Sequence, residues 1–228
     1  MSPNSFFAKF LRFMAIVLMG LTAGFTLLGG IGTTCVALNP TGFSESMALL
    51  APYQWLYILF VLAGIALGVF GIYATILLIK GAEKAYRYTL SVLIAGAAIG
   101  ILHMIVSQAL RGKSMPVDAV VYTTALTLIL FLIFRIPWVW QGVNFTQGSM
   151  QSNLPAGGAA AIAVGLLALS IQFTMGSTHT WNNVNYAEAF NVAMTGFGVA
   201  CLLLGIGVIL SNFALRFTNH YNLVHATS

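Results

Sequence analysis

His103 is the residue whose spacing most clearly favours chemistry within an apolar segment. It follows Gly96 and Gly100 by seven and three residues, so all three share one face of a helix, and Ser107 extends that face. A histidine on a face of small residues points into a helix bundle, where its two ring nitrogens need partners. The pattern fits a ligand contact, a proton-sensing group, an axial ligand of a haem or chlorin, or a structural hydrogen bond between helices.

A polar stretch at 178–189 supplies a second group of candidates, with His, Trp, three Asn, Tyr and Glu in a short space. Aromatic faces, amide donors and a carboxylate are common in pockets for small ligands. The same residues could instead form a turn whose Asn side chains cap backbone groups. Together with a glutamine in the preceding apolar run, the predicted ligand-binding set is His103, Ser107, Gln172, His179, Trp181, Asn183, Tyr186 and Glu188.

Signatures of catalysis are missing from the sequence. It contains no GxSxG, no HExxH and no P-loop, and its four acidic residues lie too far apart to predict a carboxylate pair. Cys35 and Cys201 fall at different depths in separate apolar runs, which argues against a disulfide or a metal site. We therefore expect a non-enzymatic protein with no catalytic and no metal-ligating residues. The sequence indicates no particular cofactor. The alternative is an enzyme that uses His103 or His179 with a bound metal or cofactor.

The composition places these residues in a membrane. Of the 228 residues, 59% are apolar and 6% are charged, and the mean hydropathy is +0.94. A soluble domain carries roughly a quarter charged residues, and a disordered chain needs low hydrophobicity, so both classes are excluded. The net charge of +5 does not predict nucleic-acid binding, because the basic residues are scattered rather than clustered in a patch.

Six apolar stretches are long enough to cross a bilayer, which takes about 20 residues as a helix. They cover residues 13–37, 53–79, 88–110, 119–136, 156–177 and 190–212. The first exceeds the apolar core of a signal peptide, so we interpret it as a retained helix. The sequence therefore predicts an all-α integral membrane protein, a bundle of about six transmembrane helices that forms a single polytopic domain over residues 1–228.

The basic residues orient these helices. With six spans, both termini lie on one side, and that side collects Lys9, Arg12, Lys80, Lys84, Arg87, Arg135 and Arg216. The other side holds only Arg111 and Lys113. Because basic residues accumulate in cytoplasmic loops, we expect both termini in the cytoplasm and the chain in an inner or plasma membrane.

Small and polar residues suggest how the helices associate. GxxxG pairs at Gly20/Gly24, Gly64/Gly68 and Gly96/Gly100 favour a tight bundle of the first three spans, and the last span adds Gly196, Gly198, Gly205 and Gly207. Polar side chains concentrate in the outer halves of the spans, as an outward-facing vestibule above a dry floor would require. Alternatively, the Thr and Ser hydroxyls bond the backbone of their own helix.

Two functional hypotheses follow from these patterns. The first is a membrane protein with an outward-facing polar pocket for a small solute, acting as a permease component or a sensor. The second is an accessory or assembly subunit of a larger membrane complex, such as a respiratory or photosynthetic one. In that case the Gly-rich helix faces bind partner subunits and the remaining apolar surface contacts the lipid bilayer.

The orientation can be tested by cysteine labelling in a chain whose Cys35 and Cys201 are changed to Ala. Single cysteines at Glu45 and Asn183 should react with an impermeant thiol reagent from outside intact cells, and one at Lys84 should not. Labelling of Lys84→Cys from outside would invert the orientation.

Overall fold

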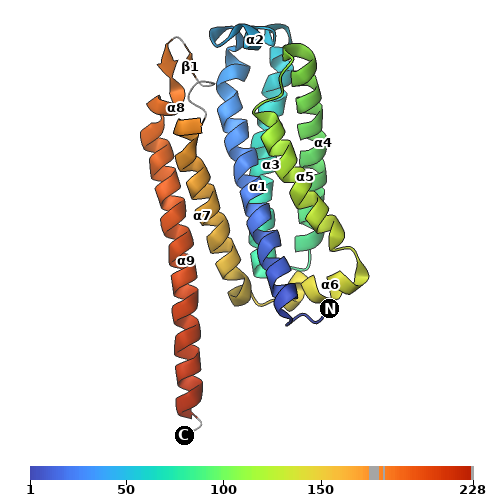
Figure 1. Ribbon diagram of the computed structural model, residues 1–228, viewed down its shortest axis with the longest axis vertical. Coiled ribbons are helices and arrows are strands. Elements are labelled where there is room, and N and C mark those ends of the chain that lie inside the picture. Colours follow the sequence, from blue (N-terminus) through green and yellow to red (C-terminus); the bar gives the residue numbers. More distant parts are fainter. Residues whose placement is uncertain (175–179, 182, 227–228) are drawn as a thin grey trace.

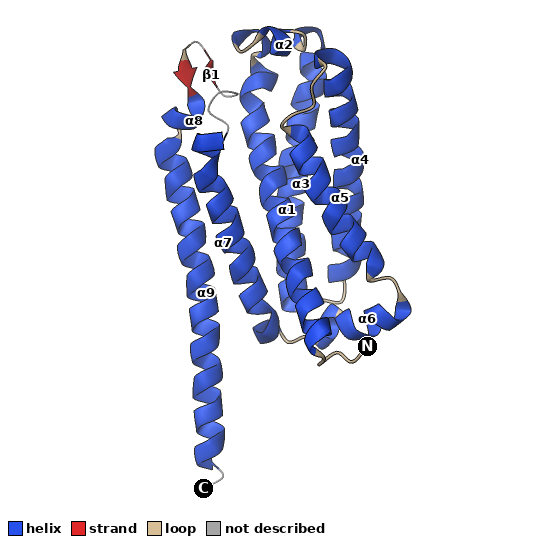
Figure 2. Cartoon of the chain, viewed as in Figure 1, coloured by secondary structure: helices blue, strands red, loops and turns tan. Residues whose placement is uncertain are grey.

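The computed structural model describes residues 1–174, 180–181 and 183–226, and it is a bundle of long helices (Figures 1 and 2). The long helices are α1 (Phe6–Leu38), α3 (Gln54–Lys80), α4 (Ala85–Arg111), α5 (Val117–Ile133), α7 (Met150–Thr174) and α9 (Asn191–Ala226). The shorter elements are η1 (Pro40–Gly42), α2 (Glu45–Ala48), η2 (Ala51–Tyr53), α6 (Pro137–Val143), η3 (Phe145–Gln147), β1 (Thr180–Trp181), β2 (Val184–Asn185) and α8 (Tyr186–Ala189).

The prediction of an all-α membrane bundle is confirmed. Five helices are long and apolar enough to cross a membrane, and there are six such spans if the bent pair formed by α5 and the segment after it is taken as one. α5 has only 17 residues, or about 25 Å at 1.5 Å per residue, and the chain then bends by 101° into residues 137–147. The predicted fourth span therefore ends early, at Ile133, because Pro137 starts a new helix that lies across the bundle.

Helix α1 lies in the middle of the bundle and contacts most of the other spans. On one side it packs against α3 and α5, with α4 beyond them, and on the other side it packs against α7. α9 packs along α7, so α7 and α9 form a hairpin beside a unit of α1, α3, α4 and α5 (Figure 1). The N- and C-termini lie at the same end, which we call the inner end, and α2 and β1 lie at the outer end.

The GxxxG pair of α1 packs against α7. A Cβ atom added at Gly20 would lie 2.6 Å from Cβ of Ala160, and one added at Gly24 would lie 2.6 Å from Cγ2 of Val164. Real Cβ atoms do not approach so closely, so any larger residue would force the two helices apart. The glycines set the separation between α1 and α7.

The GxxxG pairs of α3 and α4 pack against other helices than α7. A Cβ at Gly68 of α3 would lie 2.7 Å from Cα of Leu27 in α1, and one at Gly100 of α4 would lie 2.9 Å from Val121 in α5. The expected close packing among the first three spans is thus correct for α1 and α3. The pairs on α1 and α4 instead approach the fifth and fourth spans.

Helices α7 and α9 pack closely at glycines that are spaced seven residues apart on each helix. A Cβ at Gly158 would lie 2.7 Å from the carbonyl oxygen of Gly205, and one at Gly165 would lie 2.7 Å from the carbonyl oxygen of Gly198. A polar contact also links the two helices. Pro155 within α7 has no N–H, so it cannot donate to the carbonyl oxygen four residues earlier. The buried Asn212 of α9 donates to that carbonyl, at Gln151, over 2.7 Å.

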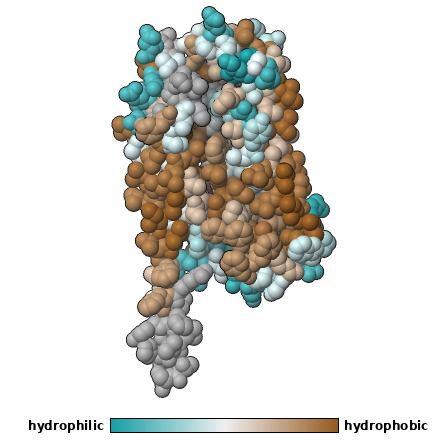
Figure 3. Space-filling model, in the orientation of Figure 1, coloured by the Kyte–Doolittle hydropathy of each residue, from teal (hydrophilic) through white to brown (hydrophobic). Residues whose placement is uncertain are grey.

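The inner end is closed by α6 and an aromatic cluster. Phe131, Phe134 and Phe145 are fully buried there and pack on one another. The bundle surface above this end is largely apolar, and hydrophilic side chains gather at both ends (Figure 3). This banded surface is what a protein that crosses a bilayer requires.

The α1–α3 contact can be tested by making the same Gly→Ala substitution at a position inside the contact and at an open position elsewhere. Gly68→Ala should lower the Tm of the detergent-solubilised protein, because overpacking typically costs about 1–3 kcal/mol. Gly207→Ala is the matched control, since no atom lies within 4 Å of its Cβ position and Ala favours a helix by about 1 kcal/mol over Gly. Its Tm should be unchanged or higher. Equal Tm values for the two variants would contradict the close approach of α1 and α3.

Candidate functional site

A polar contact links the outer ends of α3 and α4. The hydroxyls of Tyr57 and Ser107 lie 2.8 Å apart and form a hydrogen bond. Tyr57 is 2% exposed and Ser107 is fully buried. A pair of this kind inside a bundle fixes the register of two helices, because neither hydroxyl can turn to water instead.

His103 lies one turn further into the bundle than Ser107. Its ring stacks on Phe60 with ring centroids 4.3 Å apart, and it meets the ring of Tyr57 edge-on at 5.2 Å. Its Nε2 atom is buried and has no hydrogen-bond partner. The ring therefore points into the bundle toward α3, whereas Gly100 on the same helix faces α5.

Arg111 completes this group, although the distribution of basic residues predicted it only as a charge outside the membrane spans. It is the last residue of α4, and it follows His103 and Ser107 at intervals of four residues, so the three lie on one helix face. Its Nε atom is buried without a partner. Its charge is close enough to interact with both Tyr57 and His103. We call Tyr57, His103, Ser107 and Arg111 the α3–α4 polar cluster.

The cluster has unused hydrogen-bonding capacity. Within the described residues, three buried side-chain atoms lack a partner, and two of them are His103 Nε2 and Arg111 Nε. The guanidinium nitrogen is a donor, and the imidazole nitrogen either donates or accepts, depending on its tautomer. Buried polar atoms in proteins almost always have partners, so such an atom is suited to bind a water or a ligand group.

The polar stretch at 178–189 forms a small hairpin. Strands β1 and β2 pair antiparallel, and Asn183 between them has a positive φ of 62°, which Asn tolerates better than most residues. The side chain of Asn185 accepts hydrogen bonds from the backbone N–H groups of Ala187 and Glu188 and so caps α8. Turn and cap roles, the alternative raised for these Asn residues, account for both of them.

The remaining predicted residues of this stretch are placed as follows. Tyr186 opens α8 and its ring lies 6.0 Å from that of Phe190, while Glu188 is exposed. Trp181 belongs to β1, and Gln172 belongs to the end of α7. His179 lies outside the described residues.

The predicted site residues fall into two separate groups. His103 and Ser107 face α3, whereas α8, which Tyr186 opens, packs against α7, α9 and the two strands. Figure 1 shows this second group at the opposite side of the bundle from α4, with α1 and α3 between them. The structure does not bring the two groups into one pocket.

Threonine side chains expected around a vestibule mostly bond their own helix. Thr33, Thr34, Thr123 and Thr124 each donate to the carbonyl oxygen four residues earlier. This is the alternative that the sequence left open, and it uses the hydroxyl hydrogens that a solute could otherwise accept. At the outer end of the described chain, the buried side-chain atoms without a partner are His103 Nε2 and Arg111 Nε, both in the α3–α4 polar cluster.

The described residues contain no group of three or more His, Cys, Asp or Glu side chains that could hold a metal ion. Cys35 and Cys201 are both free thiols. Comparison with protein-family models, with curated proteins and with solved structures found no match to this chain.

The Tyr57–Ser107 contact can be tested by a double-mutant cycle. Tyr57→Phe or Ser107→Ala alone should lower the free energy of unfolding by about 1–3 kcal/mol, because each leaves a buried hydroxyl unpaired. The double variant should lose less than the sum of the two, since it removes both hydroxyls. Strictly additive losses would mean that the two hydroxyls are not coupled.

Proposed function

We propose that this protein is a non-enzymatic, multi-pass protein of an inner or plasma membrane that binds a small polar solute from the outer side. It would act as a permease component or as a membrane sensor. The distribution of basic residues favours a cytoplasmic position for both termini. In that orientation the α3–α4 polar cluster lies at the depth of the outer half of the bilayer.

The observation that supports this proposal is the pair of buried polar atoms without partners, His103 Nε2 and Arg111 Nε. They project from one face of α4, on either side of a serine that Tyr57 already engages. A bound group that accepts a hydrogen bond from Arg111 and pairs with His103 would satisfy both atoms at once.

The chemistry of the cluster narrows the class of solute. A guanidinium in a partly dry site favours an anionic oxygen, such as that of a carboxylate. Phe60 and Tyr57 add aromatic surface beside the polar atoms. The cluster therefore suits a small solute with one carboxylate or similar acceptor group and a compact apolar part.

The proposal is tested by thermal unfolding of the purified protein with a library of small carboxylates and other polar solutes. A solute that binds should raise the Tm of the wild type and be recovered chemically unchanged. Arg111→Gln should weaken its binding roughly 10- to 100-fold, because a hydrogen bond to a charged group is worth about 1.5–3 kcal/mol. His103→Phe keeps the aromatic stacking and should also weaken binding.

The matched control is Lys113→Gln, which removes an exposed positive charge two residues after Arg111, at the same end of the bundle. It should leave the solute's effect on the Tm unchanged. If no solute raises the Tm of the wild type, or if Lys113→Gln and Arg111→Gln weaken binding equally, the cluster is not a solute site.

A second candidate function, an accessory subunit of a larger membrane complex, is favoured by one feature of α9. Gly196 and Gly207 are exposed with no atom within 4 Å of either Cβ position, and their spacing of 11 residues puts them on one helix face. Such a face allows close approach of a partner helix. If the protein is such a subunit, the purified chain should be unstable alone, and no solute should raise its Tm.

A further inference from the structure

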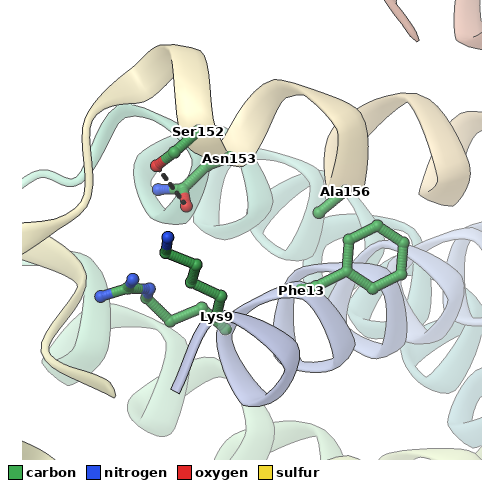
Figure 4. A pocket seen from close by; sticks show the side chains of 6 residues that line it. Lys9, Phe13, Ser152, Asn153 and Ala156 are labelled. Atoms are coloured by element: carbon green, nitrogen blue, oxygen red, sulfur yellow. Dashed lines mark hydrogen bonds between the residues drawn. The ribbon is translucent and has the colours of Figure 1, made fainter. Parts of the chain in front are cut away.

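At the inner end, α1 and α7 enclose a hollow of about 160 Å³. One water molecule needs roughly 10–15 Å³ of such space, so there is room for a larger polar group. The hollow is lined by Lys9, Arg12, Phe13, Ser152, Asn153 and Ala156 (Figure 4).

Arg12 brings a buried positive charge to this hollow. It is only 4% exposed, and its Nη1 and Nη2 atoms donate to the carbonyl oxygens of Gly142 and Pro3 over 3.2 Å and 2.9 Å. These two bonds hold the guanidinium in place but use only part of its five N–H donors. No carboxylate pairs with it among the described residues, so its charge is not compensated by the protein.

Lys9 adds a second positive charge that is free to bind. It is exposed, and no hydrogen bond or ion pair to its ammonium group is found in the described part of the chain. Figure 4 shows its side chain extending from α1 toward Ser152 and Asn153 of α7. Two basic side chains one turn apart on α1 therefore line the same space.

The facing wall comes from the first turn of α7. Asn153 is buried and is held by two hydrogen bonds, from its Nδ2 to the carbonyl oxygens of Leu78 and Ile79 at the end of α3. Ser152 lies beside it and also lines the hollow, and its hydroxyl donates to the carbonyl oxygen of Ser149 over 2.7 Å. The N-terminal turn of a helix carries a partial positive charge, which strengthens the preference for an anion.

We infer that this hollow is a binding site for a phosphate group, held by Lys9 and Arg12 of α1 against Ser152 at the start of α7. The phosphate belongs either to a phospholipid headgroup or to a soluble phosphate ester. The inner end faces the leaflet rich in anionic lipids if the termini are cytoplasmic, and Phe13 and Ala156 continue the hollow as an apolar wall.

The experiment compares wild-type full-length protein with Lys9→Gln, which removes the positive charge and keeps a polar side chain. Lys84→Gln is the matched control, because Lys84 is an exposed basic residue at the same end that does not line the hollow. One arm measures Tm in nanodiscs of equal parts phosphatidylglycerol and phosphatidylcholine, and in nanodiscs of phosphatidylcholine alone. The other arm titrates inorganic phosphate and glycerol 3-phosphate in an uncharged detergent at constant ionic strength.

If the site takes a lipid headgroup, phosphatidylglycerol should raise the Tm and soluble phosphates should not. If it takes a soluble ester, glycerol 3-phosphate should raise the Tm in detergent. In either case Lys9→Gln should weaken the apparent affinity about five-fold and Lys84→Gln should not. The proposal is overturned if neither probe stabilises the wild type, or if the two variants respond alike.

Discussion

The close approach of α1 to its neighbours is the constraint on which this bundle depends. Lipid chains are as apolar as the helices, so burial of apolar surface cannot drive the helices together, and van der Waals contact between backbones must do so. α1 provides that contact on three sides, through Gly20 and Gly24 toward α7, Gly29 toward α5, and Gly30 toward α3. Because α1 is held in this way, its buried Arg12 can reach both the N-terminal segment and α6.

A second constraint is that polar groups at membrane depth must find partners within the protein, and most of them do. Threonine hydroxyls bond the preceding turn of their own helix, and Asn212 occupies the carbonyl that Pro155 cannot reach. Against this background the exceptions are informative. Among the described residues they are the hydroxyl of Thr89, the unpaired nitrogens of His103 and Arg111 at the outer end, and the uncompensated charge of Arg12 at the inner end.

The helical segments and their order could be predicted from the sequence because hydrophobic length is a local property. The pairing of helices could not, since a GxxxG pair such as Gly96/Gly100 shows a close contact without naming its partner, which is α5. For the site, the spacing placed His103 on an inward face but did not connect it to Phe60 or to Arg111. Gly112, which ends α4 with a φ of 65°, was the signal that the helix continues through Arg111 and keeps it on that face.

The two candidate sites differ in how they are built, and this difference has a physical consequence. The α3–α4 polar cluster lies within one pair of neighbouring helices, whose packing also rests on aromatic stacking. The inner hollow lies between α1 of the four-helix unit and α7 of the α7–α9 hairpin, and its wall residue Asn153 also ties α7 to α3. An anion bound there would join charges of α1 to the first turn of α7, so its binding energy would add to the glycine contacts that hold the hairpin against the rest of the bundle.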